Sequence, residues 1–172
     1  MAQIPKTQKK LREARFFCGH MSVSERSPGL DREDLDFYLS AFLAADRTVT
    51  GFFDEKRNKQ YRRWFHQWKM VLAESDRKLL NDMTSQRDAE IHEEGAEVLP
   101  EVEFVPVTEI DRGPRSSPAY GMHWGIPPPK IGTKVLYFNL RGKRAKVTTT
   151  CKRHLELLDQ LVRDFESAFP RE

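Results

Sequence analysis

Apolar residues recur every three or four positions over most of the chain, which is the spacing of amphipathic helices. Four such segments lie in the first part of the sequence, over residues 6–23, 31–53, 58–73 and 75–92. A fifth segment, residues 151–169, carries a clear apolar stripe. The pattern predicts a mainly α-helical protein in which the first four helices form an antiparallel bundle.

The apolar spacing changes after Pro100 from helical to alternating, which is typical of β-strands. Residues 102–107 alternate in this way, and residues 134–140 and 146–150 repeat the strand signal on either side of a glycine-containing turn. The sequence therefore predicts a small β-hairpin or sheet within residues 100–150. Residues 111–133 are rich in Gly, Pro and Ser, and we expect them to form a long loop of the kind that is usually functional or mobile.

A chain of 172 residues has the length of one domain, with a core large enough to need neither a disulfide nor a metal ion. We expect a single domain over residues 1–172, composed of a helical core at 6–95, the strands, and a C-terminal helix. That last helix is expected to dock on the helical core or to pack against a second subunit.

Two cysteines, Cys18 and Cys151, have no CxxC spacing, and no secretory apolar segment precedes the first helix. We therefore expect reduced thiols and a cytoplasmic protein. No apolar run approaches the length of a membrane span, so no membrane association is expected. The sequence also lacks a phosphate-cradling glycine loop, an HExxH motif and a GxSxG motif, so no metal or cofactor is expected.

The net charge of +3 is small, but the basic residues are unevenly distributed. Besides the cations of residues 6–15, two basic clusters are candidates for binding a nucleic-acid backbone. The members of these two clusters are Lys56, Arg57, Lys59, Arg62 and Arg63 in the first, and Arg141, Lys143 and Arg144 in the second. Aromatic residues alternate with the first cluster, which fits a base-stacking surface, but their helical spacing favours a position in the core.

The residues best suited to chemistry lie at the end of the fourth helix, where Arg87 and Asp88 are followed by His92. Asp88 and His92 are four residues apart and share one helix face, so the carboxylate could orient the imidazole. Arg87 occurs in the same four-residue repeat as the apolar Met83 and Ile91, so it should face a core or an interface and needs a partner there.

Asp46 is the candidate partner for Arg87, because it stands in the apolar stripe of the second helix, where an unpaired carboxylate is costly. The alternative is that Asp46 turns to the helix margin and pairs with Arg47 or with water.

The Arg87–His92 motif and the aromatic and alanine-containing helix that starts at Asp31 resemble the HEPN family of small all-helical domains. The resemblance extends from Asp31 to Gly95 and leaves out the strands and the last helix. It implies a HEPN-like helical bundle and a metal-independent endoribonuclease, whose site forms where two motif helices meet in a homodimer. His92 would transfer protons, Arg87 would hold the scissile phosphate and Asp88 would orient one or both.

The resemblance also implies RNA as a substrate, and it raises an antitoxin-like protein as a partner, because some HEPN proteins are toxins. Toxin-type members that pair with a nucleotidyltransferase carry a tyrosine two residues after the histidine, where this chain has Glu94. Two alternatives remain open. In one, the chain is a non-catalytic helical module in which Arg87 is a structural ion-pair residue; in the other, it binds RNA through the basic clusters without cutting it.

Overall fold

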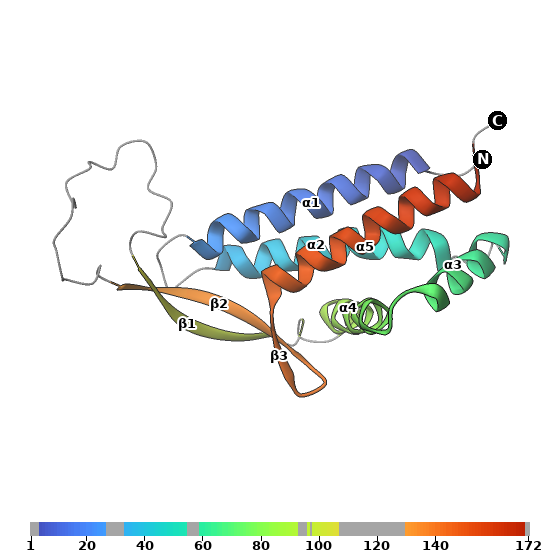
Figure 1. The fold of residues 1–172 in the computed structure, drawn as a ribbon. Helices are drawn as coiled ribbons and strands as arrows, with labels where there is room; N and C mark the ends of the chain where they lie inside the picture. Colours follow the sequence, from blue (N-terminus) through green and yellow to red (C-terminus); the bar gives the residue numbers. More distant parts are fainter. Residues whose placement is uncertain are drawn as a thin grey trace, which may run out of the picture.

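The computed structural model describes residues 4–26, 33–54, 59–92, 96, 98–106 and 130–170, which contain five helices and three strands (Figure 1). In chain order these are α1 (Ile4–Arg26), α2 (Glu33–Asp54), α3 (Lys59–Val71), α4 (Glu74–His92), β1 (Val98–Pro106), β2 (Lys130–Leu140), β3 (Lys143–Lys146) and α5 (Val147–Ala168). The predicted mainly helical protein with a small antiparallel sheet is confirmed. None of the helices in the described ranges is long and apolar enough to cross a membrane.

The helical core is built around α1, α2 and α5, which run alongside one another, with α3 and α4 on one side (Figure 1). The predicted apolar stripe of α2 is buried, including Phe42, Val49 and Phe53 at 0–1% exposure. The last helix docks on this core rather than leaving its stripe free, because Leu158 and Leu161 are fully buried. Residues 151–169 thus belong to the same hydrophobic core as the first four helices.

The aromatic residues of α3 pack inward, as their helical spacing predicts. Phe65 and Trp68 are buried, and the Trp68 indole Nε1–H donates to Asp164 of α5 at 2.8 Å. The ring of Phe165 lies 4.9 Å from that of Tyr61 and 5.3 Å from that of Trp64, measured between centroids. These rings join α3 to α5, so they are not available as a base-stacking surface.

The expected strand over residues 146–150 is wrong, because β3 ends at Lys146 and α5 begins at the next residue. The run Val147-Thr148-Thr149-Thr150 is β-branched and has strand propensity, but propensity is a weak preference that packing overrides. Val147, Thr148 and Thr150 are buried in the first turns of the helix, whereas Thr149 is exposed. The helix therefore starts four residues earlier than its apolar stripe indicates.

The sheet is antiparallel with strand order β1-β2-β3. β2 begins at Lys130, so the last four residues of the expected loop at 111–133 belong to a strand; residues 107–129 lie outside the described residues. β2 and β3 are joined by Arg141 and Gly142, whose φ angles are 53° and 77°. Positive φ at both central residues is the signature of a type I′ hairpin turn, which matches the twist of the strands.

The hydroxyl of Tyr137 on β2 donates a hydrogen bond to the Glu103 carboxylate on β1. This hydrogen bond, followed by burial, raises the pKa of Tyr137 from 10.0 to about 12. Since the folded-state pKa is the higher one, the hydrogen bond stabilises the fold fully below pH 10, and the stabilisation is lost as the pH rises from 10 to about 12.

We expect Tyr137 to be the last of the four tyrosines to ionise in an ultraviolet absorbance titration of the folded protein. Tyr137→Phe should remove that late transition, whereas Tyr61→Phe should leave it in place. A late transition that persists in Tyr137→Phe would contradict the assignment.

Candidate functional site

The guanidinium of Arg87 is held at the surface between α4 and α2. Its Nη1 donates to Thr50 Oγ1 of α2 at 2.9 Å, and its Nε and Nη2 both donate to Asp88 Oδ1 at 3.1 Å. Only 14% of the Arg87 side chain is exposed, against 55% for Asp88. The Arg87 side chain is therefore mostly buried and is fixed by hydrogen bonds to α2 and α4, and a small part of it is exposed to solvent.

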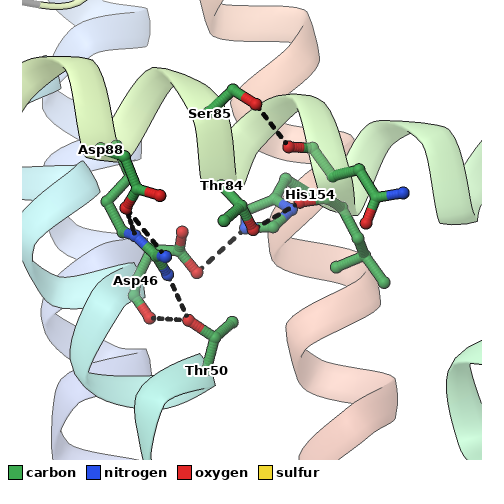
Figure 2. A network of polar contacts seen from close by, with 9 residues as sticks. Asp46, Thr50, Thr84, Ser85, Asp88 and His154 are labelled. Carbon is green, nitrogen blue, oxygen red and sulfur yellow. Dashed lines mark hydrogen bonds and ion pairs between the residues drawn. The ribbon is translucent and has the colours of Figure 1, made fainter. Parts of the chain in front are cut away.

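Thr50 links Arg87 to the backbone of Asp46. The Thr50 hydroxyl accepts from Arg87 and donates to the Asp46 carbonyl oxygen at 3.1 Å, four residues back along α2. Figure 2 shows Thr50 below Asp46 and Asp88 above them on α4. Arg87 thus contacts the helix that carries Asp46, but through a threonine hydroxyl.

The Asp46 carboxylate is buried, as its place in the apolar stripe predicts, but its partner is His154 of α5 rather than Arg87. His154 Nε2 lies 3.0 Å from Asp46 Oδ1, and 1% of each side chain is exposed (Figure 2). The expected direct pair between Arg87 and Asp46 is therefore wrong. The alternative, in which Asp46 turns to Arg47 at the helix margin, is wrong as well. The carboxylate points across the core to α5, while Arg87 lies along the edge of α2.

The Asp46–His154 contact is close but poorly aligned. Among the described residues, neither ring nitrogen of His154 has a hydrogen-bond partner within normal angular limits. The same holds for Oδ1 of Asp46. The His154 ring also lies edge-on to Phe42, with 6.3 Å between centroids. The pair is thus a close contact of two polar groups inside an apolar layer, where a charged group without a neighbour is costly.

Cys151 lies in the same layer, one helical turn before His154. Burial, followed by Cys18 and Asp46, raises the pKa of the Cys151 thiol well above its ordinary value. Burial also raises the pKa of Cys18, and both cysteines are free. Neither thiol therefore has the thiolate character that a nucleophile or a metal ligand requires.

His92 is the last residue of α4, and its side chain lies outside the described residues. The Ala96 N–H donates to Glu90 Oε2 at 2.7 Å, which connects Ala96 to the last turns of α4. Arg87, Asp88 and His92 thus share the C-terminal half of one helix. The expected contact between Asp88 and the His92 imidazole stays a prediction.

The basic clusters are partly neutralised by carboxylates. Arg141 Nε donates to Asp82 of α4 at 2.8 Å, and Arg144 pairs with Glu101 and lies over the Tyr137 ring. Lys143 is exposed, as are Lys59, Arg62 and Arg63 on α3, while Lys56 and Arg57 lie outside the described residues. Both arginines of the second cluster therefore have a carboxylate partner within the protein.

Sequence reasoning missed His154, although a signal for it was present. His154 follows Cys151 by three positions and precedes Leu158 by four, so it lies in the apolar stripe of the last helix. The same argument that identified Asp46 as a polar residue in a buried row applies to His154. Two ionisable residues in buried stripes of different helices are each other's natural partners.

Within the described ranges, no group of three or more His, Cys, Asp or Glu side chains converges in a way that could hold a metal ion. No protein family, curated protein or solved structure matches the chain. The resemblance to the HEPN family therefore rests on the motif and on the helix before it, and it stays a prediction.

Proposed function

We propose that this protein is a metal-independent endoribonuclease of the HEPN type, which acts as a homodimer. The observation that carries the proposal is the anchored guanidinium of Arg87. Thr50 and Asp88 accept three of its five N–H groups, and the remaining two have no acceptor among the described residues. A cation held in this way can donate its remaining N–H groups to a phosphate without further loss of side-chain freedom.

The proposed reaction is cleavage of RNA by its own 2′-hydroxyl. A base removes the 2′-hydroxyl proton, the 2′-oxygen attacks the adjacent phosphorus, and the 5′-oxygen leaves with a proton, so that a 2′,3′-cyclic phosphate remains. His92 transfers these protons, because imidazole gains and loses a proton near neutral pH. Arg87 offsets the charge that grows on the phosphate oxygens, and Asp88 keeps Arg87 in place.

The homodimer follows from the number of motif copies. The chain carries one copy of the motif, in which an arginine is followed by a polar residue, three further residues and a histidine, at Arg87–His92. In the HEPN family the site is formed by two motif helices. Two chains placed with their α4 C-terminal ends together would supply two arginines and two histidines to one RNA strand. The proposal therefore requires activity and dimer formation to occur together.

Cleavage of labelled single-stranded RNA in EDTA tests the proposal, with the oligomeric state of each sample measured by light scattering. We expect the wild-type dimer to cut and His92→Ala to cut about 100-fold more slowly while it remains a dimer. His66→Ala, which removes an exposed histidine from α3, is the matched control and should cut like the wild type. Equal cleavage by His92→Ala, or intact RNA with the wild-type dimer, contradicts the assignment.

The second candidate is a non-catalytic helical module, and the Arg87–Thr50 bond favours it. That bond joins α4 to α2, and Thr50 is bonded in turn to the Asp46 carbonyl. In this interpretation, Arg87→Gln lowers the free energy of unfolding by about 1–3 kcal/mol, and the wild type leaves RNA uncut. RNA that is bound in low salt but not cut would indicate the third interpretation, a binding protein without catalysis.

A further inference from the structure

β1 lies at one edge of the sheet, because the strand order is β1-β2-β3 and no other strand of the described ranges pairs with it (Figure 1). It pairs with β2 along its whole length, from Val98 to Pro106. Three of its apolar side chains are exposed, with exposed fractions of 45% for Leu99, 49% for Val102 and 68% for Phe104. A long edge strand with exposed apolar side chains is a surface on which another strand can pair.

The direction of the backbone groups in β1 follows from one hydrogen bond. Thr133 Oγ1 of β2 donates to the carbonyl oxygen of Glu103, the residue directly opposite it, at 3.4 Å, so this carbonyl faces β2. The N–H and C=O groups of one strand residue point to the same side, and those of its neighbours point to the other side. The backbone groups of Val102 and Phe104 therefore point away from β2, toward the open edge.

Two prolines limit this open edge to a short segment. Pro100 and Pro106 follow the same alternation as the two residues whose backbone faces the edge, and a proline has no N–H to donate. Prolines at such positions of an edge strand leave the pairing with the neighbouring strand intact. Val98 also faces this side, and its N–H donates to the carbonyl oxygen two residues before it at 2.8 Å. Within β1, the N–H groups left for another strand are those of Val102 and Phe104.

The pattern of donors along β1 is symmetric about Glu103. Val102 and Phe104 are its two neighbours, and the prolines at positions 100 and 106 lie three residues away on either side. Two antiparallel copies of β1 that are centred on Glu103 therefore place Val102 of each copy opposite Phe104 of the other. Each of these pairs then exchanges both of its N–H···O bonds, and the prolines lie outside the paired segment. The exposed side chains of Val102 and Phe104 also meet across the two strands.

The acidic residues of β1 are offset by cations of their own chain. Glu103 accepts a hydrogen bond from Tyr137 and lies 3.6 Å from Lys146 Nζ. Glu101 forms an ion pair with Arg144. Like charges directly opposite each other destabilise a strand pair. Because each carboxylate has a positive neighbour, two copies of β1 can approach with little repulsion.

We infer that β1 pairs with β1 of a second copy of this chain, antiparallel and centred on Glu103, so that the two sheets join into one. The contact is isologous, because the same surface is used by both copies. The paired segment is short, so the association is weak and depends on protein concentration. The contact uses neither Arg87 nor His92, and it does not rest on the proposed function. A protein that forms both this contact and the one at the ends of α4 assembles beyond a dimer as its concentration rises.

Disulfide cross-linking of the full chain with Glu103→Cys tests the register. In the inferred pairing Glu103 lies opposite its own copy, with about 4.5 Å between the two Cα atoms, a distance that a disulfide can span. Glu101→Cys is the matched control, because the Glu101 and Glu103 side chains are similarly exposed, at 38% and 36%. The two copies of Glu101 would lie about 13 Å apart, which is too far for a disulfide. The native Cys18 and Cys151 are buried and do not compete.

With oxidised glutathione as the oxidant, we expect Glu103→Cys to give a covalent dimer on a non-reducing gel and Glu101→Cys to give none. Equal cross-linking of the two variants, or no cross-linking of Glu103→Cys, overturns the inference.

Val102→Pro provides a second test, which leaves the charged residues of β1 in place. It removes one of the open N–H groups, and proline is tolerated there because that group faces away from β2. Val102→Thr is the matched control, since threonine is also β-branched and keeps the N–H. In sedimentation velocity runs at increasing concentration, we expect the mass of the wild type and of Val102→Thr to rise. The rise should be lost in Val102→Pro, with the thermal unfolding midpoint close to that of the wild type. A wild type whose mass does not rise, or a rise that persists in Val102→Pro, contradicts the inferred pairing.

Discussion

His154→Leu is expected to lower the free energy of unfolding by about 3–5 kcal/mol, because it leaves the Asp46 carboxylate in the core without its neighbour. Both side chains are 1% exposed, so water cannot replace the lost contact. Leucine fills most of the imidazole volume, which keeps the cavity contribution small. Urea denaturation followed by circular dichroism measures the change.

The double variant Asp46→Leu, His154→Leu distinguishes a buried charge from a packing defect. Removal of both polar groups eliminates the desolvation cost as well as the attraction, and such replacements are often neutral or stabilising. We therefore expect the double variant to recover most of the lost stability. A double variant as unstable as His154→Leu would show that shape, and not charge, sets the cost.

Arg15→Gln is the matched control for His154→Leu, because it breaks an ion pair that is exposed instead of buried. Arg15 bonds Asp159 of α5 at 2.6 Å, which is closer than the buried contact, but 57% of the arginine side chain is exposed. Exposed pairs contribute at most about 1 kcal/mol. The shorter but exposed Arg15–Asp159 pair is thus expected to contribute less to the free energy of unfolding than the longer, buried His154–Asp46 contact.

Phe165→Ala is the second substitution with a large expected effect, about 3–5 kcal/mol. Phe165 is 1% exposed, and its ring lies 5.0 Å from that of Phe53 on α2 and 4.9 Å from that of Tyr61 on α3. Alanine would open a cavity where three helices meet. The same urea denaturation measures the loss.

The control for Phe165→Ala is Phe37→Ala on α2. Phe37 is 66% exposed, so its truncation should change the free energy of unfolding by less than about 0.5 kcal/mol. If both substitutions cost the same, the aromatic cluster is not the centre of the core that its ring distances indicate.

Periodicity predicted the helices well because each one buries a single stripe. The stripe of α2 also placed Asp46 in the core correctly, since burial follows from position on a helix face. It could not identify the partner of Asp46, because the pairing of faces depends on how helices cross. Arg87 shows the same limit: its contact with Thr50 lies 37 residues away along the chain.

The errors around residues 130–150 have a different origin. Val147 to Thr150 have strand propensity, yet they start a helix because the helical turn buries three of them against the core. Lys130 to Thr133 follow three prolines, a pattern that is typical of a loop, but they pair with residues 103–106 of β1. In both places long-range pairing or packing decides a structure that short-range preference leaves ambiguous.

The junction of β3 and α5 has no spacer, since Lys146 is the last residue of the strand and Val147 is the first of the helix. One inserted residue would turn the helix by about 100° and advance it by about 1.5 Å. That rotation would carry His154 away from Asp46 and Phe165 out of its cluster. The phase of the last helix is therefore set by the hairpin, so a change of chain length at this point would alter the core without replacing any core residue.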